Sequence, residues 1–299
     1  MKYAVIGTGA VGGYYGAMLA RAGHEVNFLF HNDYEHVLAH GLQVHSCNGD
    51  FLLPTVHAYN DTALMPEVDV VIVGLKTTNN RLLSTLLPPL LHTDTIVLLI
   101  QNGVGVEDDV QAQFPNAQLA AGLAFICSSK TEPGVVNHQF YGSINLGNYS
   151  VSDSERFLRL VADFTEAGVP AHNVEYNEAR WRKAVWNMPF NGMTVVMNCR
   201  TSDLLAQPQM RQVIREQMLE VIHAAWACGV TAISEDFADA MIQSTLNMVP
   251  YYPSMKLDYD FHRPMEIDYL YTRPLQIARQ HGFVMPRLEM LEAQLRQLS

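Results

Sequence analysis

The segment Gly7-Thr8-Gly9-Ala10-Val11-Gly12 most limits the folds open to this chain. It follows a β-rich run, Lys2 to Ile6, and opens a helix-patterned stretch, Ala10 to Ala22, before a second β-rich run, Glu25 to Phe30. In a strand–loop–helix unit of this kind, the first glycine permits a tight turn, the second lets backbone approach a pyrophosphate, and the third lets helix and strand pack closely. The helix N-terminus attracts the phosphates. The sequence therefore predicts dinucleotide binding by Gly7, Thr8, Gly9, Ala10, Val11 and Gly12.

Strands and helices continue to alternate beyond this unit. Val68 to Leu75 and Thr95 to Ile100 are apolar β-rich runs, and Asn79 to Leu91 between them carries leucines at helical spacing. This order predicts a parallel sheet with right-handed crossovers. From Gly122 to Gly147, short β-prone runs separated by Gly and Pro indicate a few mixed or antiparallel strands that close the sheet.

Helical periodicity dominates the last part of the chain. We therefore predict an α/β protein, with an N-terminal Rossmann-type doubly wound sheet over residues 1–172 and a C-terminal all-helical domain over residues 173–299. The expected helices of the second domain are Glu178 to Met197, Gln209 to Ala227, Glu235 to Met248, Met265 to Gln280 and Pro286 to Gln297.

Composition excludes several classes of protein. The 48% apolar and 16% charged residues are typical of a globular chain, and a net charge of −11 disfavours nucleic acid and anionic lipid as partners. No apolar run approaches the roughly 18 residues of a membrane span, and no signal peptide is apparent. The four cysteines show no C-x-x-C pair and the twelve histidines no H-E-x-x-H motif, so we expect no metal and no disulfide framework. We expect a cytoplasmic protein.

The end of the second strand normally selects the cofactor. A carboxylate there binds the ribose 2′-hydroxyl of NAD, whereas a cation accepts the 2′-phosphate of NADP. The strand ends here with Phe30, His31 and Asn32, and Asp33 is expected to cap the next helix. NADPH is therefore favoured, and NADH stays open.

Lys183, Asn187 and Asn191 lie four residues apart, so they share one face of a helix. An ammonium group with two amides can bind a carboxylate and donate to a carbonyl oxygen that gains negative charge during hydride transfer. The spacing is equally compatible with a solvated lysine and two surface amides. Downstream, Ser254 follows a proline, where a serine hydroxyl commonly caps a helix. Glu266 opens a helix-patterned stretch, where a carboxylate commonly interacts with the helix dipole.

Taken together, these residues resemble the ketopantoate reductase (2-dehydropantoate 2-reductase) family over essentially the whole chain. The features, in sequence order, are the Gly7 to Gly12 loop, Gly74-Leu75-Lys76, Gln101-Asn102-Gly103, the Lys183/Asn187/Asn191 helix, and Ser254 twelve residues before Glu266. The resemblance implies that Lys183 donates a proton to the substrate carbonyl and that Glu266 orients the cofactor or the catalytic group. It also implies that Asn187, Asn191 and Ser254 hold the substrate, that Lys76 contacts the cofactor and that Asn102 lies near the nicotinamide ribose.

Two departures from the family pattern concern the ligands. His31 stands where the family usually has an arginine for the 2′-phosphate, and histidine is mostly neutral near pH 7 and lacks the guanidinium fork. Thr201 stands where a further substrate-binding asparagine is expected.

The leading hypothesis is an NADPH-dependent reductase of a small 2-oxo acid, 2-dehydropantoate giving pantoate. One alternative is a β-hydroxyacid dehydrogenase, which also places an asparagine four residues after a lysine; Asn191 and the Ser254/Glu266 pair weigh against it. Another is a nicotinamide-binding sensor without turnover, which would not need the proton donor. The sequence does not set the oligomeric state and is compatible with a homodimer.

Overall fold

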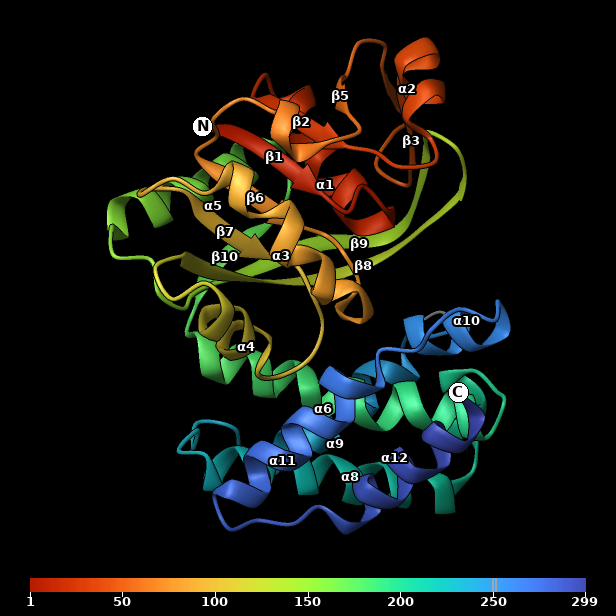
Figure 1. Cartoon of the computed structure of the whole chain (residues 1–299). Helices are drawn as coiled ribbons and strands as arrows, with labels where there is room; N and C mark the ends of the chain where they lie inside the picture. Colours follow the sequence, from red (N-terminus) through yellow and green to blue (C-terminus); the bar gives the residue numbers. More distant parts are fainter. Residues whose placement is uncertain (249, 251) are drawn as a thin grey trace. The chain divides into compact units, whose positions relative to one another are not determined.

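The computed structural model describes residues 1–248, 250 and 252–299, residue 131 by its backbone alone (Figure 1). The chain divides into two compact units. Unit 1 comprises Met1–Gln101 and Glu107–Tyr176, and unit 2 comprises Asn102–Val106 and Asn177–Ser299. The sequence pattern gave no sign that Asn102–Val106 packs with the helical unit.

Unit 1 is built on one ten-stranded sheet with the order β4-β3-β9-β8-β7-β6-β1-β2-β5, in which β10 also pairs with β9. The strands are β1 (Lys2–Ile6), β2 (Glu25–Leu29), β3 (Leu42–Ser46), β4 (Phe51–Leu53), β5 (His57–Tyr59), β6 (Val70–Val73), β7 (Ile96–Leu99), β8 (Gln118–Glu132), β9 (Val135–Asn148) and β10 (Ala171–Val174). Strands β1, β2, β5, β6, β7 and β8 pair in parallel, whereas β8 and β9 are antiparallel. This confirms the predicted Rossmann-type sheet.

The strand order reverses direction at β1. The chain passes from β1 to its neighbour β2 on one side, and later from β6, on the other side of β1, outward to β7. Right-handed crossovers then put the connecting segments on opposite faces of the sheet, and ligands of such sheets bind at the carboxyl ends of the strands at this reversal.

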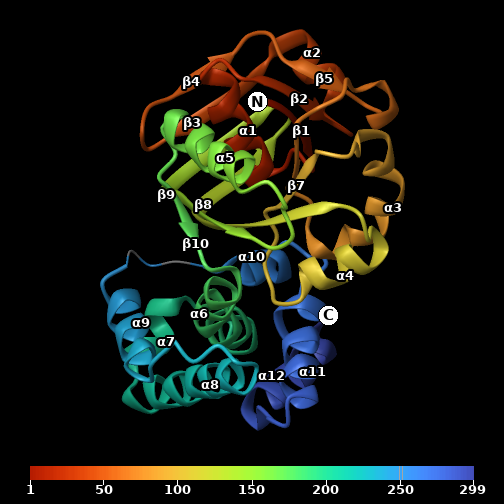
Figure 2. The same ribbon diagram turned by 90° about the vertical axis from the view of Figure 1, so that its left-hand side faces the viewer.

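The helices of unit 1 are α1 (Ala10–Arg21), α2 (Tyr34–His40), α3 (Leu83–Leu86), α4 (Val106–Gln113) and α5 (Ser154–Glu166). Helix α1 packs against β8, β9 and α5, and the two helices lie side by side in Figure 2. The single helix predicted over Asn79 to Leu91 is wrong: the segment is a 3₁₀ turn (Thr77–Leu82), then α3, then a second 3₁₀ turn (Pro88–Leu90). Pro88 and Pro89 lack the amide hydrogens that a continuing helix needs.

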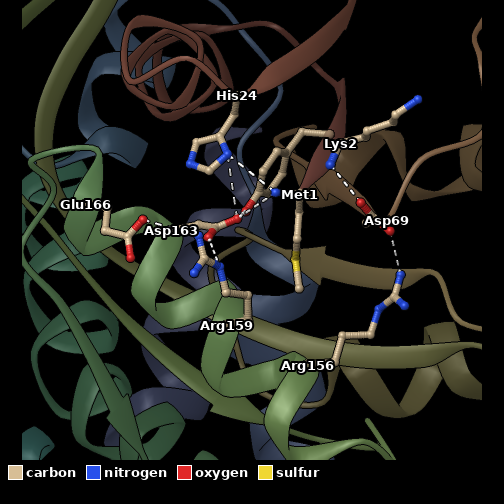
Figure 3. A network of polar contacts seen from close by, with 9 residues as sticks. Met1, Lys2, His24, Asp69, Arg156, Arg159, Asp163 and Glu166 are labelled. Carbon is tan, nitrogen blue, oxygen red and sulfur yellow. Dashed lines mark hydrogen bonds and ion pairs between the residues drawn. The ribbon is translucent and has the colours of Figure 1, made fainter.

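A buried carboxylate ties α5 to the amino end of β1 (Figure 3). Asp163 is fully buried and accepts hydrogen bonds from the Tyr3 hydroxyl (2.6 Å) and the Met1 ammonium (3.1 Å), and Arg159 Nε lies 2.7 Å from its other oxygen. Burial by itself would raise the pKa of Asp163, but the Tyr3 hydroxyl and the Met1 ammonium outweigh it and hold that pKa below its usual range. The network therefore needs the charged carboxylate.

Unit 2 is helical around its own apolar core. Its helices are α6 (Tyr176–Val196), α7 (Thr201–Ala206), α8 (Pro208–Ala227), α9 (Asp236–Leu246), α10 (Ser254–Asp260), α11 (Arg273–Gln280) and α12 (Pro286–Leu298). The predicted helix from Met265 to Gln280 is instead a π-helical turn, Asp268–Thr272, that leads directly into α11. Helix α6 continues through Pro189.

Candidate active site

One pocket of unit 2 brings together three polar side chains of α6, from Arg180, Lys183 and Asn187. Because residues three and four apart share a helix face, the three side chains reach the same pocket. The remaining lining comes from Ala184 and Met188 of α6, Gly103 and Val104 of the 102–106 segment, and Tyr269 and Leu270 of the π-helical turn. Arg180 and Asn187 are only 2% and 8% exposed, so this is not a solvated helix face.

The pocket changes the acid strength of its lysine. The pKa of Lys183 falls to about 7, first because burial disfavours the charged form and then because the Arg180 guanidinium adds positive charge nearby, while Glu266 opposes the change. Near neutral pH the Lys183 side chain is therefore available in both its ammonium and its amine form. A group of this acidity is suited to exchange a proton with a bound ligand at pH 7.

Two backbone features shape the wall opposite α6. Gly103 has a φ of +112°, and a Cβ atom there would lie 2.4 Å from the Tyr269 carbonyl oxygen, so this position requires glycine. The next amide, that of Val104, donates to the same oxygen at 3.2 Å. Tyr269 belongs to the π-helical turn, an irregularity that is frequent at functional sites. Asn102 precedes Gly103 and is thereby held in unit 2, beside a residue that lines the pocket.

The other predicted substrate residues lie farther along unit 2. The Asn191 side chain is 3% exposed, donates to the Asn187 carbonyl (3.0 Å) and accepts from the Met255 amide (3.1 Å). It therefore fixes the start of α10, where Ser254 is the exposed first residue. Glu266 is 7% exposed and close enough to Lys183 to affect its pKa. Thr201, the departure from the family pattern, is buried at the start of α7.

The predicted cofactor residues of unit 1 follow the carboxyl ends of adjacent strands: the glycine loop follows β1, His31 follows β2, and Lys76 follows β6. Gly7 has a φ of +85°, and a Cβ there would lie 2.3 Å from the Leu75 amide nitrogen. At Gly9, the N-cap of α1, a Cβ would meet nothing within 4 Å. The loop thus packs tightly at its first glycine and leaves open space at its second, which fits a pyrophosphate on the helix N-terminus.

Sequence reasoning missed Arg180. Its position three residues before Lys183 puts it on the same helix face, which is the signal that could have found it. No sequence pattern could have predicted that Tyr269 and Leu270 line the pocket, because their position depends on the π-helical turn.

Comparison with known proteins gives the chain a family. The model of the ketopantoate reductase PanE/ApbA family matches residues 3–150, and its C-terminal counterpart matches residues 175–299. The chain belongs to the ketopantoate reductase family. It is therefore an oxidoreductase of that family, as the sequence features predicted.

Two 2-dehydropantoate 2-reductases agree with this assignment over nearly their full lengths. The chain is similar to a 2-dehydropantoate 2-reductase of Nostoc sp., at 44% identity over 99% of this chain and 94% of the relative. It is also similar to the crystal structure of 2-dehydropantoate 2-reductase from Geobacter metallireducens, at 40% identity and a TM-score of 0.96 with complete coverage of both chains. The ternary structure of D-mandelate dehydrogenase with NADH and anilino(oxo)acetate shares the fold, at 23% identity and a TM-score of 0.89 over 100% of this chain and 98% of that one.

Two kinds of feature are absent from the residues that the structure describes. Among them, no helix is long and apolar enough to cross a membrane. The same part of the chain holds no cluster of three or more histidine, cysteine, aspartate or glutamate side chains placed to bind a metal ion.

Proposed function

We propose that this protein reduces 2-dehydropantoate to pantoate with NADPH, and that Lys183 donates the proton. The observation that carries the proposal is the pocket in which Lys183, with a pKa lowered to about 7, lies beside Arg180 and Asn187. A lysine of ordinary pKa would hold its proton too tightly to exchange it efficiently near neutral pH. The full-length similarity to 2-dehydropantoate 2-reductases supports the choice of substrate.

The proton transfer follows from the charges of the pocket. When bound, the reduced nicotinamide supplies the hydride to the carbonyl carbon. The Lys183 ammonium donates to the carbonyl oxygen as negative charge grows there, and the side chain ends as a neutral amine. Arg180 makes loss of that proton easier, whereas Glu266 favours the charged form before the reaction.

The substrate carboxylate needs positive charge in a chain whose net charge is −11. Arg180 and Lys183 supply two cations to one pocket, and the Asn187 amide can donate to a carboxylate or accept from a hydroxyl. We assign Asn191 and Ser254 to the same substrate, with Asn191 acting in part by fixing the start of α10 through the Met255 amide.

For the cofactor, we assign the Gly7 to Gly12 loop and α1 to the pyrophosphate, His31 to the adenosine side, and Lys76 and Asn102 to further contacts. The open space at Gly9 supports the pyrophosphate assignment. NADPH is proposed over NADH because no carboxylate stands at the immediate end of β2, where NAD-binding folds place the acceptor for the ribose 2′-hydroxyl.

The test is to measure initial rates, from the loss of reduced-nicotinamide absorbance, with 2-dehydropantoate and with a panel of 2-oxo and 3-hydroxy acids. NADPH and NADH are used in parallel. We expect turnover with 2-dehydropantoate and NADPH to exceed that of every other pair. Absence of turnover with the whole panel would refute the reductase, and faster turnover of 3-hydroxy acids would favour the β-hydroxyacid dehydrogenase alternative.

The same assay tests Lys183 itself. Lys183→Ala should lower kcat by about 100-fold or more, since a positioned general acid contributes roughly that factor. Lys2→Ala, at the amino end of β1, is the matched control and should leave kcat unchanged, because this lysine pairs with Glu25 at the surface. NADPH affinity should be similar in both variants, and a wild-type rate in Lys183→Ala would contradict the assignment.

A further inference from the structure

Lys130 of β8 reaches the loop and strand end where the adenosine side of a dinucleotide binds. Its ammonium donates to the Thr8 carbonyl oxygen at 2.7 Å, inside the glycine loop, and forms an ion pair with Asp33. It also lies 5.5 Å from the centre of the Phe30 ring, at the end of β2. The Thr8 hydroxyl in turn donates to the Leu29 carbonyl at 2.7 Å. Lys130 therefore links the carboxyl ends of the neighbouring strands β1 and β2.

The structure also corrects the expected role of Asp33. Asp33 stands at the N-cap position of α2, but its side chain makes no cap hydrogen bond. It instead accepts from the Gly134 amide at 3.2 Å, at the tip of the β8–β9 hairpin, and pairs with Lys130. Burial would raise the pKa of Asp33, but Lys130 and the Gly134 amide outweigh it and hold that pKa below its usual range. The Asp33 carboxyl group is thus charged at neutral pH.

The Lys130 ammonium has donor capacity beyond these two partners. An ammonium carries three hydrogens, and the hydrogen bond to Thr8 and the ion pair with Asp33 occupy two of them. Its side chain is 17% exposed and that of Asp33 is 14% exposed, so both reach solvent at this point. The ammonium thus has one hydrogen left to donate to a ligand oxygen.

This position matters because His31 lacks the guanidinium group with which an arginine binds a phosphate. In dinucleotide-binding folds the residues at the end of the second strand contact the adenosine ribose. A carboxylate there accepts a hydrogen bond from the 2′-hydroxyl of NAD, whereas a cation binds the 2′-phosphate of NADP. Here a carboxylate, that of Asp33, and a cation, that of Lys130, are both present, but Lys130 belongs to the distant strand β8. The β8–β9 hairpin carries it there, since its far end pairs with β3 through residues 135–138 of β9.

We propose that Lys130 is the residue that binds the adenosine 2′-phosphate, and that Lys130 and Asp33 together set the preference between NADPH and NADH. This inference rests on the proposed function, because it requires that the chain bind a nicotinamide dinucleotide. Lys130 donates to a phosphate oxygen, whereas Asp33 accepts from a 2′-hydroxyl and repels a phosphate. Lys130 thus takes the place of the guanidinium that His31 does not provide.

The test measures dissociation constants of NADPH and NADH by titration of the full chain, with no substrate present. Lys130→Met should weaken NADPH by roughly tenfold or more, the worth of one charge-assisted hydrogen bond, and change NADH by less than about threefold. Asp33→Asn should have the reverse selectivity, weakening NADH while NADPH stays equal or tightens. Lys2→Met, which removes a surface lysine from the opposite end of β1, is the matched control and should change neither constant.

The titrations have outcomes that would overturn the role proposed for Lys130. If Lys130→Met weakens both cofactors equally, or neither, Lys130 is only a structural link between the hairpin and the glycine loop, and the inference is overturned. If the wild-type chain binds neither cofactor, the proposed function fails as well. If Lys130→Met does not fold, wild-type protein still gives a result: rising salt should weaken NADPH more than NADH, because it screens the charge on the 2′-phosphate, and identical salt dependence overturns the inference. Lys130→Arg should keep the preference for NADPH.

Discussion

Replacing Lys183 by methionine should stabilise the folded protein, and the gain should shrink as pH rises. The pKa of Lys183 falls from 10.5 to about 7 on folding, so the folded state binds fewer protons than the unfolded state between these values and stability increases with pH there. Below pH 7 the penalty for carrying the charge is complete. At about 1.4 kcal/mol per pH unit it amounts to about 5 kcal/mol at pH 6 and about 2 kcal/mol at pH 9. The advantage of Lys183→Met should therefore decrease by about 3 kcal/mol between pH 6 and pH 9.

Urea unfolding of the cofactor-free protein measures this change. The three tryptophans, Trp181, Trp186 and Trp226, all belong to unit 2, so their fluorescence reports the unit that contains Lys183. Comparing one variant at several pH values cancels the packing difference between lysine and methionine, which does not depend on pH. The matched control is Lys256→Met. Lys256 is 2% exposed and paired with Asp260, so its replacement should lower stability instead. A stability difference between wild type and Lys183→Met that is flat with pH would refute the reasoning.

Three further predictions concern other parts of the molecule. Arg180→Met should raise the pKa of Lys183, because a nearby positive charge is removed, and so move the alkaline limit of the reduction rate to higher pH; an unshifted limit would contradict the coupling. Gly7→Ala should abolish NADPH binding in a titration, since its Cβ would lie 2.3 Å from the Leu75 nitrogen, and wild-type affinity would contradict this account of the loop. Asp163→Asn should lower the free energy of unfolding by about 3 kcal/mol or more, because it leaves the partners of a buried carboxylate uncompensated. That cost, measured in urea, should diminish as pH falls through the lowered pKa of Asp163, and a cost unchanged in acid would count against it.

Local patterns predicted the elements that depend on local physics. The glycine loop, the buried strands after it and the long helix with Lys183, Asn187 and Asn191 were readable because turn, strand and helix each impose their own spacing. The sequence did not indicate that the segment from Asn79 to Leu91 is broken into short turns, since its leucines keep helical spacing across Pro88 and Pro89. The β8–β9 hairpin is longer than its Gly and Pro content suggested, because bulges at Phe125/Ile126 and Cys127/Ser128 absorb the irregularity without ending the ladder.

The contacts that define the sites are mostly non-local, and spacing carries no information about them. Gly103 meets Tyr269 and Asp33 meets Lys130 across long stretches of chain. Neither pairing follows from any periodicity. The sequence therefore indicated which residue types the chemistry needs at Lys183 and Asn187. It did not indicate that Arg180 shares their pocket or that Lys130 of the distant strand β8 reaches the glycine loop and Asp33.

The most direct test of Lys183 as the proton donor is the pH dependence of kcat/KM in both directions. Reduction of 2-dehydropantoate requires the ammonium form, so its kcat/KM should fall with rising pH above about 7, the pKa of Lys183. Oxidation of pantoate requires the amine form, so its kcat/KM should rise through the same pH and level off above it. The predicted result is a pair of mirror-image curves, each of which reaches half of its own plateau value near pH 7. Parallel curves, or two curves without an inflection near pH 7, would contradict the assignment.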